Sequence, residues 1–487
     1  SERVEKGSTV CPCLCGGGIQ INREGSFLEI QEIKEEVKDS LQKILAYADC
    51  DKKLEEAFIK SFTSYKRLSQ KSSSDDAARI LRHELTGLFY KLYEKVFGTF
   101  VKTGKLPVVI RMFLEFGYVD EELAGMENAV YLYQLVEQLP TNPGEGVYSL
   151  FQWLVAVYAG KKEPSRNELD MDYREYLREE KRMRRISPEE EEALLKNNLS
   201  RVNFEIRNMF ISVNKITFGQ PTTFCPVFSK HTVLKSLSSS LVTAEKVKAI
   251  LDKIRSIDFG VFYRDTLYSN PDRGLNGLMI KTEVLPDVIL LPNVGSRGVM
   301  WQEIEGRKRD TPGRLMCSMF HVEDLEKTFM ELAGDFRWEM CKRIQGGRWN
   351  DLSEPSLTSE YCDYVQFFKR NRELSSDTKE KIKMQMGRAR NNYRQMFVSD
   401  YVQWLRYEST GSPRLNKVVR QILAVYCPFS AAVRNKVAVN PLFKEPIEKY
   451  TIIHSKEVHK ITLLCKKMET TGGVPAELAE YLRYLEG

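Results

Sequence analysis

The chain has 487 residues, 42% of them hydrophobic and 29% charged, a composition typical of a globular protein. At roughly 100–200 residues per domain, this length predicts two to four domains. The 73 Lys and Arg exceed the 67 Asp and Glu by only 6, so the average charge does not indicate a polyanionic partner. The most apolar run, Tyr148 to Gly160, is shorter than the ~20 residues of a spanning helix, which argues against a membrane protein.

Residues 1–26 predict an irregular or β-hairpin segment and contain the cluster CPCLC. In an extended strand Cys11, Cys13 and Cys15 would lie on one face, an arrangement that suits Zn. The one-residue gaps are too short for a usual zinc pair, so adventitious metal binding is the alternative. The other seven cysteines are scattered, which predicts reduced thiols and, without a signal peptide, a cytoplasmic protein.

Residues 27–160 predict an N-terminal helical domain. From Phe27 to Ile44 apolar residues recur at intervals of three and four, as in one amphipathic helix, and four or five further helices follow. Residues 161–200 change character, because Gly160 to Ser200 contains 11 acidic and 10 basic residues with few apolar ones. We interpret them as a charged linker or bridging helix.

A new helix is predicted to start sharply at Ser187 and to run to about Asn214. Ser187 fits the N-cap, Pro188 the first helical position and Glu190 the third position of a capping box. Residues 201–320 then form a mixed, loop-rich segment that is rich in Pro, Gly, Asn and Asp. Within it, VILLP at 288–292 is the clearest strand candidate.

Residues 321–487 predict a basic C-terminal helical domain. One long helix is expected from Asp377, with Glu380 in capping-box spacing, through about Ser409. No repeat of fixed period is present, which argues against a solenoid. The predicted fold class is therefore mainly α, with multi-helix bundles flanking a smaller loop-rich mixed α/β segment.

The stretch LLPNVGSRGVMWQEIEGRKRDTPGR (290–314) is the main candidate for an anion or ligand site. A Gly-rich turn after a strand can offer backbone N–H groups to an anion, Arg suits phosphate, and Trp can stack on a ring. The pattern matches neither a Walker loop nor a dinucleotide fingerprint, and a structural loop with solvated charges is the alternative. The candidate residues are Gly295, Ser296, Arg297, Gly298, Trp301, Arg307, Lys308, Arg309 and Arg314.

Catalytic candidates are weak by comparison. Glu303, Glu305 and Asp310 have no closely flanking His, so ion pairing with Arg307–Arg309 is the favoured interpretation. Five histidines are present, and His454 and His459 miss the i,i+4 spacing of a helical metal pair. The sequence therefore favours a binding protein over an enzyme, although carboxylate or Lys catalysis stays open.

Positive charge concentrates between Phe336 and Arg420, where 17 Lys and Arg face 10 Asp and Glu. Aromatic residues are interleaved with these cations, as in a groove that binds phosphates and bases. The alternative is that the aromatics belong to the core and the cations to helix rims. The candidate nucleic-acid contacts are Arg337, Trp338, Lys342, Arg343, Arg348 and Trp349.

Two functions remain open from the sequence. The first is a cytoplasmic helical interaction or scaffold protein that docks onto other proteins or onto itself, which fits the many amphipathic helices and the lack of a catalytic signature. The second is an anion-, nucleotide- or nucleic-acid-binding protein that uses the 295–314 loop and the basic 336–420 region.

Overall fold

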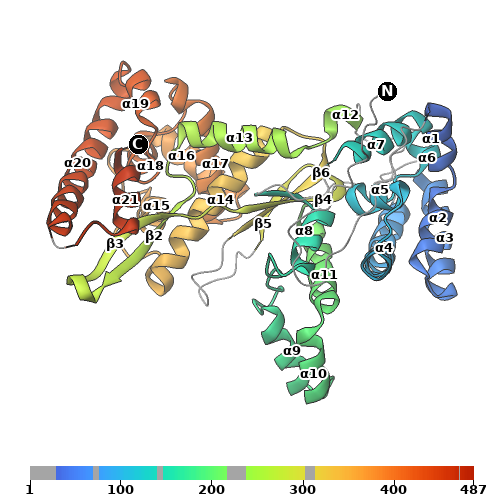
Figure 1. Cartoon of the computed structure of the whole chain (residues 1–487). Coiled ribbons are helices and arrows are strands. Elements are labelled where there is room, and N and C mark those ends of the chain that lie inside the picture. Colours follow the sequence, from blue (N-terminus) through green and yellow to red (C-terminus); the bar gives the residue numbers. More distant parts are fainter. Residues whose placement is uncertain are drawn as a thin grey trace, which may run out of the picture. The chain divides into compact units, whose positions relative to one another are not determined.

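The structure is a computed structural model of the chain and describes residues 29–69, 76–139, 146–216, 237–301, 313–470 and 472–486. These residues are mainly α-helical, as predicted, with two small sheets (Figure 1). They divide into two compact units, unit 1 (residues 1–243, 288–299 and 316–323) and unit 2 (residues 244–287, 300–315 and 324–487). In the part of the chain that is described, no helix has both the length and the apolar character needed to cross a membrane.

Unit 1 is built from the helices that precede residue 244. Their bounds are α1 (Ile30–Val37), α2 (Ser40–Ala48), α3 (Lys52–Ser69), α4 (Asp76–Thr103), α5 (Val108–Phe116), α6 (Glu121–Ala124), α7 (Met126–Gln138), α8 (Leu150–Tyr158), α9 (Tyr173–Arg182), α10 (Pro188–Lys196), α11 (Asn198–Ile216) and α12 (Leu237–Ser240). Phe89 of α4, Phe113 of α5 and Phe210 of α11 form an aromatic core, with ring centroids 5.0 Å (Phe89–Phe113) and 5.9 Å (Phe89–Phe210) apart.

A four-stranded sheet has the order β1-β4-β6-β5. Its strands are β1 (Val147–Ser149), β4 (Asp287–Gly295), β5 (Gly298–Trp301) and β6 (Arg314–His321). β1 pairs in parallel with β4, with Val147 opposite Val288. The strand predicted at 288–292 is thus confirmed and is longer than expected, and its apolar side chains are buried.

Unit 2 contains the remaining helices and an antiparallel hairpin. The bounds are α13 (Ala244–Ile257), β2 (Tyr263–Asn270), η1 (Pro271–Arg273), β3 (Leu275–Glu283), α14 (Leu325–Gln345), η2 (Gly346–Arg348), α15 (Leu357–Phe367), α16 (Ser376–Arg388), α17 (Tyr393–Arg406), η3 (Glu408–Thr410), α18 (Lys417–Tyr426), α19 (Ala431–Val437), α20 (Pro441–Glu469) and α21 (Ala476–Glu486). The sequence did not indicate the hairpin, because its turn residues suggested a loop; Gly274, at φ 68°, closes that turn.

Several predicted helix boundaries are confirmed and others are corrected. The Ser187–Glu190 capping box is present, with Glu190 N donating to Ser187 Oγ at 3.1 Å. The helix that follows ends at Lys196, however, because Asn197 accepts hydrogen bonds from the N–H groups that start α11. The helix expected from 27 to 44 is likewise broken, since Asp39 adopts a left-handed conformation between α1 and α2.

The long helix predicted from Asp377 is also two helices. α16 is capped by Ser375, whose Oγ accepts from Thr378 N at 3.2 Å, and not by Asp377 with Glu380. The chain reverses at Arg390 and Asn391, both with positive φ, and Asn392 caps α17. Polar residues at these positions fit a continuous helical pattern equally well, so apolar spacing alone could not reveal the break.

Candidate nucleic-acid interface

The structure describes only part of the predicted 295–314 site. Gly295 ends β4 and Gly298 begins β5, with the half-buried Ser296 between them. Arg297 is exposed at the turn, whereas Trp301 and Arg314 are only 3% and 5% exposed. Arg307, Lys308 and Arg309, together with Glu303, Glu305 and Asp310, lie outside the described residues. The anion site predicted with these cations therefore stays a prediction.

The N-terminal cysteines Cys11, Cys13 and Cys15 also lie outside the described residues. Within the ranges that are described, no group of three or more His, Cys, Asp or Glu side chains could hold a metal ion. The proposal of Zn at the cysteine cluster stays a prediction.

The cations predicted between 337 and 349 are largely engaged within unit 2. Arg337 Nε donates to Asp258 Oδ2 at 2.6 Å, and Arg337 Nη1 donates to the Tyr426 carbonyl at 3.1 Å. Burial opposes the charge of Arg337, but the Asp258 carboxylate outweighs it and raises the pKa of the guanidinium well above its usual value. This pair explains why a basic residue sits inside the unit.

The neighbouring candidates pack against one another. Trp338 is buried, with its ring 6.3 Å from Trp349, and Lys342 Nζ lies 4.8 Å from the centre of the Trp349 ring. Arg348 is exposed and donates to Glu354 at 2.7 Å. The side chain of Arg343 lies outside the described part of the structure. Aromatic packing and local ion pairs thus account for this segment without a ligand.

Three further cations of the 336–420 region are likewise paired. Arg394 contacts Asp335 and Glu339 at 3.3 and 3.2 Å, and Arg406 contacts Asp324 at 2.9 Å. Arg420 and Glu408 form a fully buried pair, with Nε and Oε2 2.6 Å apart. Many of the cations counted in the 336–420 region therefore form ion pairs with acids of the same chain.

A second group of cations lies on the surface formed by the end of α15, by α16 and by the turn into α17. We call it the basic surface: Lys369, Arg370, Arg372, Lys379, Lys381, Lys383, Arg388 and Arg390. All but the half-buried Lys379 are exposed. Residues 366–392 contain only three acids, Glu373, Asp377 and Glu380, so this stretch carries a net charge of +5.

The basic surface has few internal partners. Lys383 and Glu380 are 3.9 Å apart, and Glu373 lies 4.0 Å from Lys417, outside the group. For Arg372, Lys381, Arg388 and Arg390, the described residues supply no ion pair. On α16 these cations occupy two flanks, because Lys381 and Arg388, seven residues apart, share one side of the helix and Lys383 lies on the other.

An exposed aromatic ring adjoins one of these cations, Arg370. Phe367, the last residue of α15, is 46% exposed, and the Arg370 guanidinium carbon lies 5.8 Å from the centre of its ring. A ring with a neighbouring guanidinium is an arrangement on which a nucleic-acid base can stack.

A buried carboxylate holds together the three helices that carry the basic surface. Asp400 of α17 accepts from Tyr361 Oη of α15 at 2.6 Å and from Gln385 Nε2 of α16 at 2.9 Å. Burial raises the pKa of Asp400 to about 6, because the two hydrogen bonds only partly offset the loss of water. Asp400 of α17 thus links α15 and α16 through these two hydrogen bonds.

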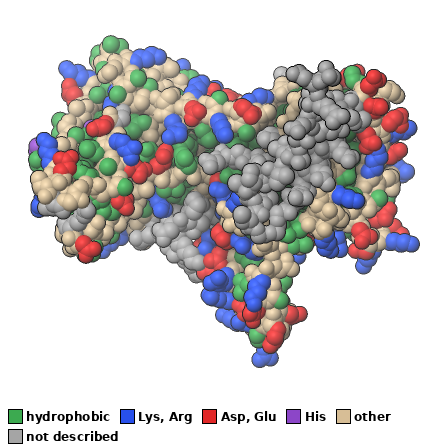
Figure 2. All heavy atoms as spheres, viewed as in Figure 1, with side chains coloured by type: hydrophobic (Ala, Val, Ile, Leu, Met, Phe, Trp, Pro, Cys, Tyr) green, Lys and Arg blue, Asp and Glu red, His purple; other side chains and the backbone are tan. Residues whose placement is uncertain are grey.

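The α9–α10 hairpin of unit 1 offers a contrast. Its segment, 160–200, has a slight acidic excess, and several of its cations form ion pairs: Arg166 contacts Asp170 and Glu175, Arg182 contacts Glu179, and Arg185 contacts Glu180. Figure 2 shows blue and red side chains mixed along this hairpin, which Figure 1 labels α9 and α10. A segment with many cations therefore carries no net positive charge when it contains as many acids.

The sequence left open whether the cations of 336–420 line a groove or lie at helix rims. The available signal was the shortage of acids across 366–392, which a narrower charge window would have shown. The acids that pair with the other cations of 336–420 could not be recognised from the sequence, because several of them lie far away along the chain.

A family model described as a domain of unknown function (DUF8509) matches residues 346–484. The match covers less than a third of the chain, and it includes the whole basic surface together with α18 to α20 and most of α21. The comparisons with curated proteins and with solved structures gave no match.

Proposed function

We propose that the protein binds single-stranded nucleic acid through the basic surface. The observation that carries the proposal is the set of exposed cations on α15, α16 and the turn into α17, one of which, Arg370, lies beside the exposed ring of Phe367. Arg and Lys side chains engage phosphates without regard to sequence, and a surface ring adds stacking with unpaired bases. Duplex bases are already stacked and paired, so the ring favours a single strand.

The decisive experiment compares two triple variants that remove the same number of charges. Lys381→Ala/Arg388→Ala/Arg390→Gly alters the basic surface, and Arg174→Ala/Arg178→Ala/Arg184→Gly alters the α9 side of the hairpin. Each set combines two exposed helical residues with one Arg at positive φ, where Gly is well tolerated. Binding of a labelled 20-nucleotide single strand is followed by fluorescence anisotropy between 50 and 200 mM KCl.

We expect the first variant to bind about tenfold more weakly, with a salt slope smaller by about 2, since each lost phosphate contact on a single strand contributes ~0.7. The control variant should stay within about twofold of the unaltered protein. Equal weakening in both variants, or no binding by the unaltered protein, would contradict the proposal.

The stacking contribution is tested separately by Phe367→Ala. Stacking of a base on an aromatic ring is worth about 1–3 kcal/mol, so affinity for the single strand should fall at least fivefold at unchanged salt slope. Affinity for a duplex of the same sequence should change little. A parallel loss for both nucleic acids would argue against stacking and leave only charge attraction.

The hypothesis of an interaction or scaffold protein stays a prediction from the sequence.

A further inference from the structure

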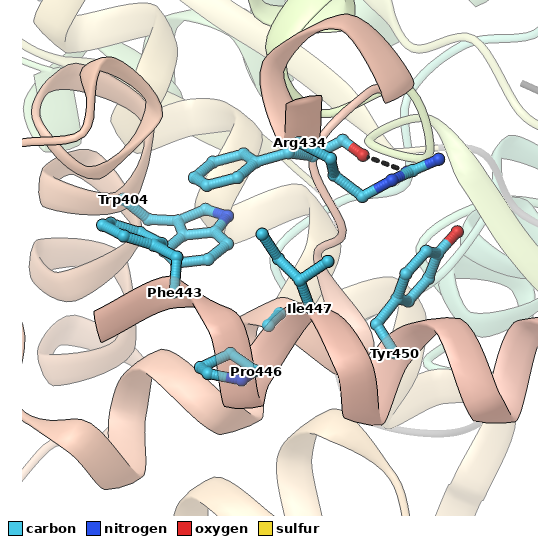
Figure 3. Close-up of a pocket in the computed structure, with 8 residues that line it drawn as sticks. Trp404, Arg434, Phe443, Pro446, Ile447 and Tyr450 are labelled. Atoms are coloured by element: carbon cyan, nitrogen blue, oxygen red, sulfur yellow. Dashed lines mark hydrogen bonds between the residues drawn. The ribbon is translucent and has the colours of Figure 1, made fainter. Parts of the chain in front are cut away.

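The last turn of α17 places one aromatic ring inside unit 2 and leaves the next one at the surface. Trp404 is buried and stacks on Phe429, with ring centroids 3.9 Å apart, and Figure 3 shows it beside Phe443 of α20. The apolar hollow at these rings measures only ≈ 10 Å³, about enough for one water molecule, whereas a ligand site usually needs several hundred Å³. Tyr407, three residues after Trp404, is 42% exposed. The hollow is therefore a packing gap of the core, and Tyr407 is the ring of this turn that a ligand can reach.

An arginine lies over the exposed ring of Tyr407. The guanidinium carbon of Arg414 is 5.4 Å from the centre of that ring, within the ~6 Å reach of a cation–π contact. Arg414 is exposed, and the described residues supply no ion pair for it. Among the cation–ring pairs of the described residues, this pair and that of Phe367 with Arg370 are the two whose ring is exposed. Unit 2 therefore presents the same combination, a surface ring with a neighbouring guanidinium, at two places.

Contacts between α15 and α18 show which end of these helices carries the first pair. Near the C-terminus of α18, Tyr426 Oη donates to Glu360 at 2.6 Å, and Asn416, the N-cap of α18, donates to Tyr364 Oη at 2.9 Å. The two helices therefore run antiparallel. Glu360, Tyr364 and Phe367 have the spacing i, i+4 and i+7, so they lie on one side of α15, the side that faces α18. Phe367 comes last in this row and thus lies at the N-terminal end of α18.

The segment that leads into α18 places the second pair at the same end. Arg414 lies two residues before the N-cap of α18, and Lys417, the first residue of α18, has its Nζ 4.0 Å from Glu373 in the loop after α15. The loop that follows Phe367 and the segment that holds Arg414 therefore adjoin at the surface. Lys417 also contacts Glu445 at 3.1 Å, so two acids offset its charge and the arginines are left to meet a ligand.

We propose that Tyr407 and Arg414 form a second stacking site for the single strand, in addition to the one at Phe367. This inference rests on the proposed nucleic-acid binding and extends it from the basic surface to the segment between α17 and α18. A strand held at both places stacks one base on each ring, while the guanidinium beside the ring contacts a phosphate.

Single substitutions test the second site in the full chain. Binding of a labelled 20-nucleotide single strand is followed by fluorescence anisotropy between 50 and 200 mM KCl. Tyr407→Ala should weaken binding at least fivefold at unchanged salt slope, because stacking on one ring is lost. Arg414→Ala should lower the salt slope by about 0.7, the contribution of one phosphate contact on a single strand. The control Tyr131→Ala removes a side chain that is 38% exposed on α7 of unit 1 and should stay within about twofold of the unaltered protein.

Photocrosslinking locates the strand directly. A single strand that carries 5-iodouracil is irradiated in complex with the unaltered protein, and mass spectrometry should find crosslinks at both Phe367 and Tyr407. If thermal melts by circular dichroism show that Tyr407→Ala is less well folded than the unaltered protein, these crosslinks decide.

Two results would overturn the second site and leave the proposed function in place. One is a folded Tyr407→Ala variant that binds as tightly as the unaltered protein while Phe367→Ala binds more weakly. The other is a set of crosslinks that includes Phe367 but not Tyr407. A loss of affinity for Tyr131→Ala as large as that for Tyr407→Ala would also count against the second site. Failure of the unaltered protein to bind the strand would contradict both proposals.

Discussion

The α9–α10 hairpin and the basic surface both carry many cations, yet only the second presents net positive charge. Residues 160–200 contain 10 Lys and Arg and 11 Asp and Glu, whereas residues 366–392 contain eight Lys and Arg and three Asp and Glu. Ion pairs such as Lys181–Glu191 neutralise the hairpin and link α9 to α10. The lesson is that the acids around a cation, and not the cation itself, decide whether a surface attracts a polyanion.

The largest effect on stability should come from breaking a buried ion pair within the 336–420 region, which carries the positive excess of the sequence. Glu408→Ala leaves Arg420 buried without its carboxylate and removes the acceptor of Arg414 N and Leu415 N. We expect the free energy of unfolding to fall by about 3–5 kcal/mol, measured by urea denaturation. Lys381→Ala on the basic surface should change it by less than about 0.5 kcal/mol. If both variants lost a similar free energy of unfolding, the buried, paired cations and the exposed cations would not differ in their contribution to stability.

An intermediate effect is expected from Asp400→Asn beneath the basic surface. The folded protein keeps a proton on Asp400 up to pH about 6, while the unfolded chain releases it near the usual value of 3.8. Stability should therefore fall as pH rises from about 4 to 6 and remain lower above that range. Asn cannot ionise, so the variant should be more stable than the unaltered protein at pH 7.5 by about 1–3 kcal/mol.

Urea denaturation at pH 4 and pH 7.5 measures this difference, and the two proteins should converge at pH 4. If the difference between them is the same at both pH values, the carboxyl does not carry the raised pKa. Nucleic-acid affinity at pH 7.5 serves as the control and should be retained, because the oxygen of the introduced amide can still accept from Gln385 Nε2 while its N–H donates to Tyr361 Oη.

The smallest effect should come from converting the hairpin into a basic surface. Glu179→Gln/Glu180→Gln/Glu192→Gln removes the acids paired with Arg182, Arg185 and Lys196 and shifts the charge of 160–200 by +3. We expect affinity for the single strand to rise about threefold at 50 mM KCl and the gain to vanish at 200 mM, as electrostatic attraction is screened. An unchanged affinity at low salt would show that net surface charge is not the controlling quantity.

Much of the local structure was legible in the sequence because it depends on neighbours along the chain. The Ser187–Glu190 capping box, the strand at 288–292 and the helical periodicity of most segments are short-range features. The continuous helices predicted across Asp39 and Asn391 were wrong, since the polar residues at these turns fit a helix as well as a turn. The hairpin of β2 and β3 was missed because its strand pairing joins residues as far apart as Tyr263 and Glu283.

The sequence by itself determined that the protein is mainly α-helical and that its positive excess lies between 336 and 420. Only the tertiary structure decided which of those cations face water. Arg337 meets Asp258 across 79 residues and Arg394 meets Glu339 across 55, whereas Lys381 and Arg388 meet no described acid. The physical reason is that burying a cation costs least where folding brings it an opposite charge, and sequence spacing does not report which distant segments pack together.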